Sequence, residues 1–231
     1  MAGAVYLGGG GSSSAEANVW DAMLRDSPRV LYWPFALPAE RVPPAEAWLR
    51  AQLAGRVPHH QQQTWISLAG RDPPDLNAFD LLFVGGGNTF RLLDHVRRHG
   101  FIDPVRAFVV AGGSYYGGSA GAVLATDSIR IADGHDPNEP GLADVGSLGL
   151  VHGLDVLPHY TPDQHHSTRQ WARRHGATVL GVPEASGLIS DNGHIRVLGP
   201  EPVYIIDANS VRAAAAGTGL ASRGSIVTTT N

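Results

Sequence analysis

Short apolar segments alternate with helical patterns along the first half of the chain. The segments have the length of strands and contain few polar residues; they lie at residues 5–7, 30–35, 64–68, 79–84 and 108–111. Such runs are typical of strands buried on both faces of a parallel sheet. Between them, residues 15–24, 44–53 and 89–99 favour helices, and the third of these carries an apolar stripe at Phe90, Leu93 and Val96. The alternation predicts a parallel sheet covered by helices.

The second half of the chain is less regular. A polar loop at 133–147 precedes a predicted strand at 151–157, a helix at 168–175 and a short strand at 179–182. From about residue 187 to 207 the pattern is that of antiparallel hairpins, with a turn at Asp191-Asn192-Gly193. The predicted fold is α/β: an open, mostly parallel sheet with helices on both faces and a small antiparallel edge near the C-terminus.

Length and composition suggest one globular domain. The 231 residues suit a single α/β unit over 1–221, followed by a small polar tail at 222–231 that we expect to be disordered. Hydrophobic residues make up 43% and charged residues 16%, which excludes a disordered composition. The net charge of −4 argues against a nucleic-acid partner or an anionic membrane surface.

The absence of particular residues and segments narrows the chemistry. The chain has no cysteine, so disulfides, thiolate zinc sites and a cysteine nucleophile are excluded. No apolar run approaches the ~18 residues of a membrane span, and the first residues lack the pattern of a signal peptide. No helical H-E-x-x-H spacing supports a metal site, and we expect neither a metal nor a cofactor. A cytoplasmic protein is the expectation.

A nucleophile motif follows the fifth apolar segment. Residues 117–121 read Gly-Gly-Ser-Ala-Gly, and a helix-forming stretch begins at Ala120. In a G-x-S-x-G turn between strand and helix, the glycines allow a tight bend that exposes the serine hydroxyl. The same pattern also occurs as an ordinary glycine-rich turn. The strand and helix on either side favour Ser119 as a nucleophile.

A serine nucleophile needs a base, and histidine has a suitable pKa. Of 11 histidines, His159 is the best candidate because it follows the predicted strand 151–157. Catalytic groups collect at the carboxyl ends of strands in open α/β sheets. His165 and His166 lie in a polar loop that could flank the same pocket.

Six segments resemble the family of dipeptidase E and cyanophycinase, serine peptidases with a class I glutamine-amidotransferase-like fold. They are VLYWPFA (30–36), VGGGNTFRL (84–92), YGGSAGA (116–122), LPHY (157–160), STR (167–169) and GVPE (181–184). Their order and spacing match over roughly residues 5–206, most of the chain. GGGNTF followed by YGGSAGA at this separation is the most specific part of the resemblance.

The resemblance implies roles for individual residues. Ser119 matches the family's nucleophile and His159 its base. The backbone N–H groups of Gly86, Gly87 and Ala120 would form the oxyanion hole. For substrate binding the matching residues are Asn88 and Arg169, and the guanidinium of Arg169 could hold a substrate carboxylate in a bidentate pair. An ordinary surface role for Arg169 remains the alternative.

The third member of the triad is open between two places. Glu184, in GVPE, matches a family glutamate. In dipeptidase E an aspartate in the loop after the nucleophile helix has this role, but the corresponding position here falls on or beside Gly134, between Asp133 and Asp136. We therefore favour Glu184 and do not expect strict aspartyl specificity. Cyanophycinase proper has an aspartate two residues before the histidine, where this chain has Leu157.

The predicted function is hydrolysis of dipeptides or short peptides through an acyl-enzyme on Ser119. One alternative is a cyanophycinase-like or other amide or ester hydrolase on the same scaffold. Another is a non-catalytic small-molecule binding protein, in which residues 8–14 would cradle a phosphate; the chain lacks the P-loop lysine and spacing for this. The expected partner is a small peptide substrate, and a homo-oligomer is left open.

Overall fold

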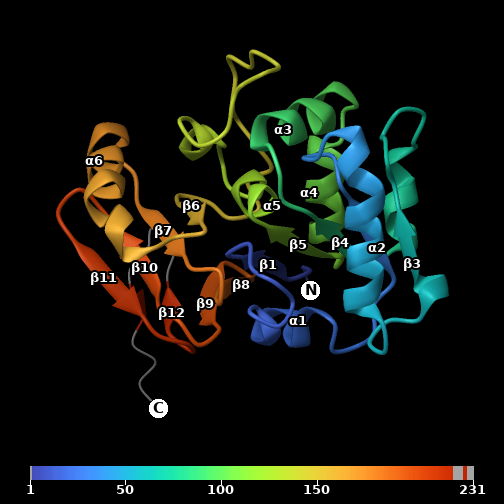
Figure 1. Cartoon of the computed structure of the whole chain (residues 1–231), viewed down its shortest axis with the longest axis horizontal. Helices are drawn as coiled ribbons and strands as arrows, with labels where there is room; N and C mark the ends of the chain where they lie inside the picture. Colours follow the sequence, from blue (N-terminus) through green and yellow to red (C-terminus); the bar gives the residue numbers. More distant parts are fainter. Residues whose placement is uncertain (1, 221–225, 228–231) are drawn as a thin grey trace.

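A computed structural model describes residues 2–220 and 226–227 and contains two β-sheets flanked by helices (Figure 1). The larger sheet has nine strands within the described residues, in the order β13-β12-β9-β8-β1-β5-β4-β2-β3. The five strands from β3 to β1 in this order run parallel to one another. The antiparallel edge begins where β1 pairs with β8, and continues through β9, β12 and β13. This architecture confirms the predicted fold class.

The strands of the larger sheet are short. The parallel part consists of β1 (Val5–Gly8), β2 (Val30–Trp33), β3 (Gln62–Thr64), β4 (Leu81–Val84) and β5 (Ser114–Gly118). The antiparallel part consists of β8 (Gly187–Asp191), β9 (His194–Leu198), β12 (Gly219–Leu220) and β13 (Ile226–Val227). Every residue of β1, β2 and β4 is buried, as expected for strands covered on both faces.

Helices cover both faces of the parallel strands. Alternate strand residues divide between two apolar clusters, so that Leu31 belongs to one cluster and Tyr32 to the other. The first cluster includes apolar residues of α3 (Thr89–Arg98), α4 (Ile102–Val110) and α5 (Ala120–Leu124). The second includes residues of α1 (Ala17–Met23) and α2 (Val42–Leu53). Figure 1 shows α3 and α5 above the strands of the larger sheet and α1 below them.

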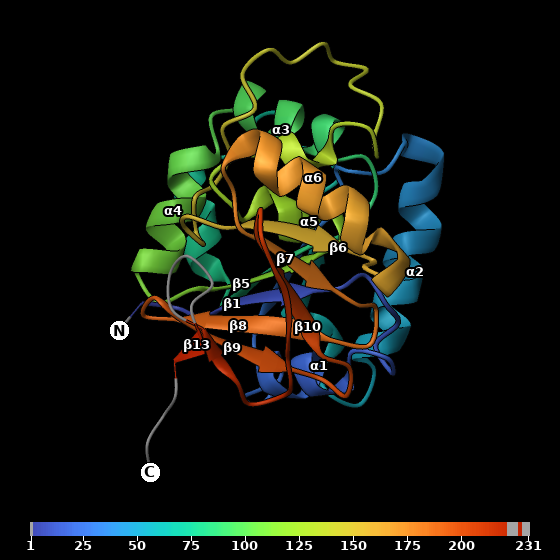
Figure 2. The ribbon, with the colours of Figure 1, turned by 90° about the vertical axis from the view of Figure 1, so that its left-hand side faces the viewer.

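A second, smaller sheet was not predicted. Its order is β11-β10-β7-β6, formed by β6 (Asp155–Pro158), β7 (Val179–Val182), β10 (Val203–Ile206) and β11 (Val211–Ala214). The helix α6 (His165–His175) packs against this sheet (Figure 2). The first apolar cluster includes Val156, Leu180 and Ile205 together with residues of the larger sheet, so both sheets share one core.

Two predicted strands of the first half were wrong. Residues 108–111 belong to the end of α4, and the strand that enters the serine turn is β5. Val105, Phe108 and Val109 are buried while Val110 is 74% exposed, which is the pattern of one helix face. In place of the strand expected at 64–68, the structure has β3 at Gln62–Thr64. These residues are polar, and β3 lies at the edge of the sheet.

The second half also departs from prediction. The strand expected at 151–157 begins only at Asp155, because the chain turns at Gly153 with φ 72°. The hairpin β8–β9 forms with its turn at Asn192-Gly193, both at positive φ. Strand β10, however, does not extend this hairpin. It pairs with β7 and β11 in the smaller sheet. The predicted disordered tail lies outside the described residues except for β13.

Candidate active site

Ser119 occupies the sharp turn between β5 and α5. Its backbone has φ 51° and ψ −113°, an unusual conformation for a residue with a side chain. The glycines on either side make the turn possible. A β-carbon on Gly117 would overlap the carbonyl of Gly121, and one on Gly121 would overlap the carbonyl of Val84. The strand–Ser119–helix arrangement is therefore a strained elbow that holds the hydroxyl at the carboxyl end of the sheet.

The hydroxyl of Ser119 begins a continuous hydrogen-bonded chain. His159 Nε2 lies 2.9 Å from Ser119 Oγ, and His159 Nδ1 lies 2.8 Å from Glu184 Oε1. This geometry fits an imidazole that donates from Nδ1 to the carboxylate and accepts from the serine at Nε2. The side chains of His159 and Glu184 are 46% and 63% exposed, so the chain opens to solvent.

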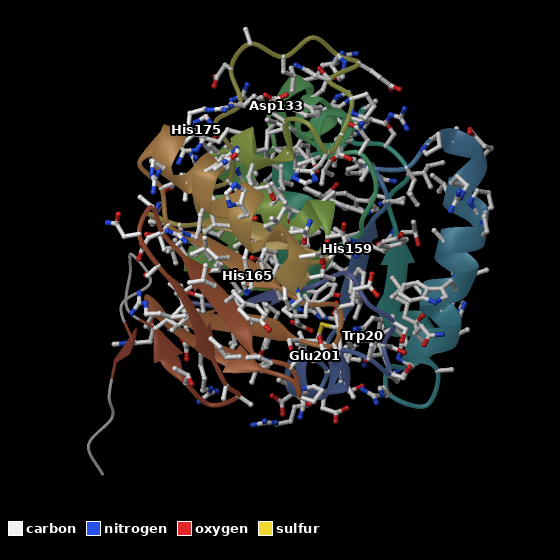
Figure 3. The ribbon with its side chains drawn as sticks, turned by 60° about the vertical axis from the view of Figure 1, so that its left-hand side comes forward. Trp20, Asp133, His159, His165, His175 and Glu201 are labelled. Atoms are coloured by element: carbon white, nitrogen blue, oxygen red, sulfur yellow. The ribbon has the colours of Figure 1, made fainter. Side chains whose placement is uncertain are left out.

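The three residues come from two sheets. Ser119 follows β5 in the larger sheet, while His159 follows β6 and Glu184 follows β7, which are parallel neighbours in the smaller sheet. Figure 3 shows His159 where the smaller sheet faces the rest of the molecule. The site is thus built where the carboxyl ends of strands from both sheets meet.

The glycine run after β1 holds these pieces together. The carbonyl of Gly9 accepts from the N–H of His159 at 2.8 Å, and the N–H of Gly9 donates to Ser186 at 3.0 Å. A β-carbon on Gly10 would overlap the imidazole of His159, and one on Gly11 would overlap the carbonyl of Glu184. The run therefore lies against the imidazole of His159 and the backbone of Glu184, a role that the sequence did not suggest.

A buried carboxylate supports the glycine run from behind. Glu16 is fully buried; its Oε1 accepts the N–H groups of Gly10 and Gly11 at 2.7 and 2.9 Å, and its Oε2 accepts the hydroxyl of Tyr116 at 2.7 Å. Burial raises the pKa of Glu16, and the hydrogen bonds oppose that rise in part. Sequence reasoning missed Glu16 because Tyr116 lies 100 residues away and no local motif marks the pair.

Three backbone N–H groups in and beside the serine elbow have no acceptor in the part of the chain that the structure describes. Ala120 is the first residue of α5, so its N–H has no acceptor within the helix. Among the described residues, no hydrogen-bond acceptor is found for the N–H of Gly86 or Gly87. A β-carbon on Gly86 would come 3.0 Å from Ser119 Cβ, so this glycine lies directly beside the elbow. Free donors beside a nucleophile suit an oxyanion.

Within the described residues, neither loop aspartate contacts His159. Asp136 Oδ2 accepts both the N–H and the hydroxyl of Thr89, at 2.8 and 2.6 Å, and so stabilises the start of α3. Asp133 is exposed and lies in the upper loop, well apart from His159 (Figure 3). Within the described residues, the carboxylate that contacts His159 is that of Glu184.

The two expected substrate ligands are engaged in structural contacts. Asn88 caps α3: its Oδ1 accepts the N–H of Arg91 at 2.8 Å, and its Nδ2 donates to the carbonyl of Pro137 at 2.9 Å. Arg169 donates to the carbonyl of Asn209, in the turn between β10 and β11, at 3.2 Å. Among the described residues that line the hollows beside Ser119, Arg169 is not included.

Two hollows meet at Ser119. The first, about 360 Å³, is lined by aromatic residues of the sheet and by the start of α2. The second, about 440 Å³, is lined by His159, Ala120 and the loop that contains His135 and Asp136. Within the described part of the chain, no group of histidine and carboxylate side chains could hold a metal ion. None of the helices within these residues is long and apolar enough to cross a lipid bilayer.

The sequence matches Peptidase family S51 over residues 3–198. The chain belongs to this family. The match covers the elbow and all three hydrogen-bonded residues, and it confirms the resemblance drawn from the motifs.

Curated relatives of this S51 chain include two Peptidase E proteins. Peptidase E of Escherichia coli O1:K1 is 34% identical over 139 residues, and that of Citrobacter koseri is 35% identical over 139 residues. In both cases the match covers 56% of this chain, and the chain spans 59% of the length of the relative.

Two solved structures share the fold of this family member. A peptidase from an acI-B1 Actinobacterium aligns with a TM-score of 0.69 over 96% of this chain and 97% of its own, at 18% identity. A putative Peptidase E protein from Listeria monocytogenes EGD-e aligns with a TM-score of 0.63 over 93% and 99%, also at 18% identity. At this identity the likeness establishes the fold alone.

Proposed function

We propose that this protein is a serine peptidase that hydrolyses dipeptides or short peptides, with Ser119, His159 and Glu184 as its catalytic triad. The observation that carries the proposal is the continuous chain of hydrogen bonds from Ser119 Oγ through the imidazole to Glu184, in a member of a peptidase family. Metal and cofactor chemistry are not required for this reaction.

The geometry supports a two-step reaction. Ser119 Oγ attacks the peptide carbonyl carbon, and its proton passes to Nε2 of His159. The carbonyl oxygen becomes an oxyanion that the N–H groups of Gly86, Gly87 and Ala120 would bind. When the C–N bond breaks, the imidazolium gives its proton to the leaving amine. Water then attacks the acyl-enzyme with His159 again as base, and releases the acid and Ser119.

Glu184 is the proposed orienting carboxylate. It bonds Nδ1 directly and would stabilise the imidazolium that forms when Ser119 attacks. Asp136, the stronger of the loop alternatives, already accepts two hydrogen bonds from Thr89. Of the expected substrate ligands, Asn88 follows Gly87 directly in the chain but caps α3, and Arg169 contacts the carbonyl of Asn209; these contacts give neither proposed role support.

The substrate class rests on the family and on the relatives named Peptidase E. A cyanophycinase-like or other amide or ester hydrolase would use the same triad, and its substrates would be longer or non-peptidic. A non-catalytic binding protein is disfavoured by the strained serine elbow and its histidine partner, which a binding role does not need. A cytoplasmic location stays a prediction, and a homo-oligomer stays open.

Two measurements test the proposal. A fluorophosphonate probe should label the wild-type protein on Ser119 and leave Ser119→Ala unlabelled, and circular dichroism should give the two proteins the same spectrum. A panel of dipeptides, a cyanophycin-type polymer and simple esters should then show turnover of dipeptides, reduced at least ~10⁴-fold in Ser119→Ala. Labelling without peptide turnover would favour the esterase alternative, and no labelling would favour the binding protein.

A further inference from the structure

The first hollow beside Ser119 has an aromatic wall with fixed geometry. Tyr32, Phe83 and Tyr116 line it and are no more than 4% exposed. Phe83 packs against Tyr116 with ring centroids 4.3 Å apart and against Tyr32 at 5.7 Å, so each ring is held by its neighbour. A wall of this kind, formed before any ligand arrives, suits a flat or branched apolar side chain.

The opposite side of the hollow is more open. Helix α2 contributes Trp48, which is 41% exposed although its ring packs edge-on against Trp20 at 6.0 Å. A half-exposed tryptophan at the rim of an apolar hollow gains contact area when a ligand covers it. The tyrosines of this wall are uncharged at neutral pH. Burial raises the pKa of Tyr32 further, to about 12.

Within the described residues, one positively charged side chain lines this hollow. Arg41, where α2 begins, is the charged residue among those that line the hollow. Its side chain is exposed and makes no ion pair or hydrogen bond within the described part of the chain. Two other arginines, one in α2 and one just after it, are paired: Arg50 binds Glu46 at 2.7 Å, and Arg56 binds Asp21 at 2.8 Å. An unpaired guanidinium beside an apolar hollow suits a ligand that carries an anionic group next to an apolar group.

We infer that this hollow binds the C-terminal residue of the peptide substrate, with a large apolar or aromatic side chain against Tyr32, Phe83 and Trp48 and its free carboxylate paired with Arg41. The inference rests on the proposed peptidase function. A C-terminal apolar residue is the simplest group that brings a carboxylate and an apolar side chain together within one residue of a scissile bond.

The consequence is a dipeptidase that recognises the free C-terminal carboxylate of its substrate. A dipeptide would place its only peptide bond at Ser119 when its second residue fills the hollow. A longer chain could not continue past Arg41 without losing the carboxylate pair. This assigns to Arg41 the carboxylate recognition that the sequence had suggested for Arg169, whose guanidinium contacts the carbonyl of Asn209 instead.

Steady-state kinetics on three matched substrates test the inference. They are X-Phe, X-Gly and X-Phe amide, where X is the N-terminal residue that the dipeptide panel selects, or Ala if none is cleaved. In the wild type, kcat/KM for X-Phe should be ~10-fold or more above that for X-Phe amide, which is the lower end of what a charge-assisted pair contributes. It should exceed kcat/KM for X-Gly by ~10-fold or more as well, because glycine has no side chain to fill the hollow. Arg41→Gln should lower kcat/KM for X-Phe by a similar factor, leave X-Phe amide unchanged, and so remove the preference for a free carboxylate.

Matched variants separate the two parts of the hollow. Trp48→Ala should lower kcat/KM for X-Phe and leave kcat/KM for X-Gly unchanged. Arg174→Gln, an exposed arginine on α6, is the charge control and should behave as wild type. Equal losses on X-Phe and its amide in Arg41→Gln, or loss of carboxylate preference in Arg169→Gln instead, would overturn the inference.

A binding measurement keeps this inference separate from the peptidase proposal. In the Ser119→Ala variant, calorimetry should give a lower Kd for X-Phe than for X-Phe amide, by ~10-fold, and Arg41→Gln should abolish the difference. If wild type cleaves no peptide but this difference is found, the proposed function fails and the hollow remains a site for an apolar carboxylate. If wild type cleaves all three substrates equally and Ser119→Ala binds them equally, the inference alone fails.

Discussion

Gly10 lies against the imidazole of His159, so close that a β-carbon on Gly10 would overlap the ring. The same glycine donates its N–H to the buried carboxylate of Glu16 at 2.7 Å. Its φ of 98° is a conformation that residues with side chains rarely adopt. Both the backbone and the space at this position therefore require glycine, and the position of His159 depends on it.

Gly10→Ala should impair catalysis more than stability. The added methyl group has to displace the imidazole, and a shift of about 1 Å at a reacting group can cost ~10²-fold in rate. Gly55→Ala is the matched control, because Gly55 also has positive φ (79°) but nothing within 4 Å of its β-carbon. Both variants should lose ~1–2 kcal/mol of stability from backbone strain, and only Gly10→Ala should lose kcat. Equal kcat values in the two variants would contradict the role assigned to this contact.

Glu184→Gln should lower kcat by ~10²–10⁴-fold while the protein stays folded. The upper figure is the loss when the orienting carboxylate of a buried triad is replaced by an amide. Glu184 is 63% exposed, so water can take over part of its role, and the smaller loss is the lower bound. Steady-state kinetics on the best dipeptide measure this, with thermal unfolding as the check on folding. A loss below ~10-fold would remove Glu184 from the triad.

Asp136→Ala should lower the stability of the protein and have little effect on turnover, the reverse of what we expect for Glu184→Gln. Its carboxylate accepts two hydrogen bonds from Thr89 at the start of α3, and removing it leaves the N–H without that partner. The expected cost is about 1–3 kcal/mol, or a fall in Tm of roughly 2–12 °C for a chain of this size. The fall in kcat should be much smaller than for Glu184→Gln. If kcat falls further in Asp136→Ala, the loop aspartate is the triad member.

The residues that could be predicted from sequence are those marked by local geometry. Ser119 stands out because Gly117 and Gly121 on either side are what a strand-to-helix elbow requires. The helix α3 could be predicted because its apolar residues recur at helical spacing over ten residues. Residues 108–111 could not, because four consecutive apolar residues fit either a helix end or a buried strand.

The features that could not be predicted from sequence depend on contacts between distant parts of the chain. Strand β10 follows the β8–β9 hairpin closely, but its partners are β7 and β11 in another sheet. No local pattern states which neighbour a strand will choose. Arg41 was equally hidden, because it becomes notable only when α2 brings it to the same hollow as Phe83 and Tyr116.

The last prediction concerns Glu16, whose burial has a measurable effect on the pH dependence of stability. Burial raises the pKa of Glu16 in the folded protein above its ordinary value. A group of this kind binds its proton more tightly in the folded state, so its contribution to stability is fully present below the unfolded-state pKa, near ~4.3. That contribution is lost as the pH rises through the folded-state pKa.

Glu16→Gln removes this titration but can keep the hydrogen bonds of its side-chain oxygen to Gly10 and Gly11. The difference in Tm, wild type minus Glu16→Gln, should therefore fall as the pH rises from about 4 towards 7. Glu46→Gln provides a control of opposite sign, since the hydrogen bond from Arg50 lowers the pKa of Glu46 in the folded protein. For that variant the corresponding difference should rise with pH, because a carboxylate with a lowered pKa contributes stability above its unfolded-state pKa and loses it in acid. Thermal unfolding of the three proteins from about pH 3 to about pH 7 measures both slopes, the Glu46 slope at the acid end and the Glu16 slope above it. A Glu16 difference that is constant or increases with pH would mean that this carboxylate is no harder to ionise in the folded protein than in the unfolded chain.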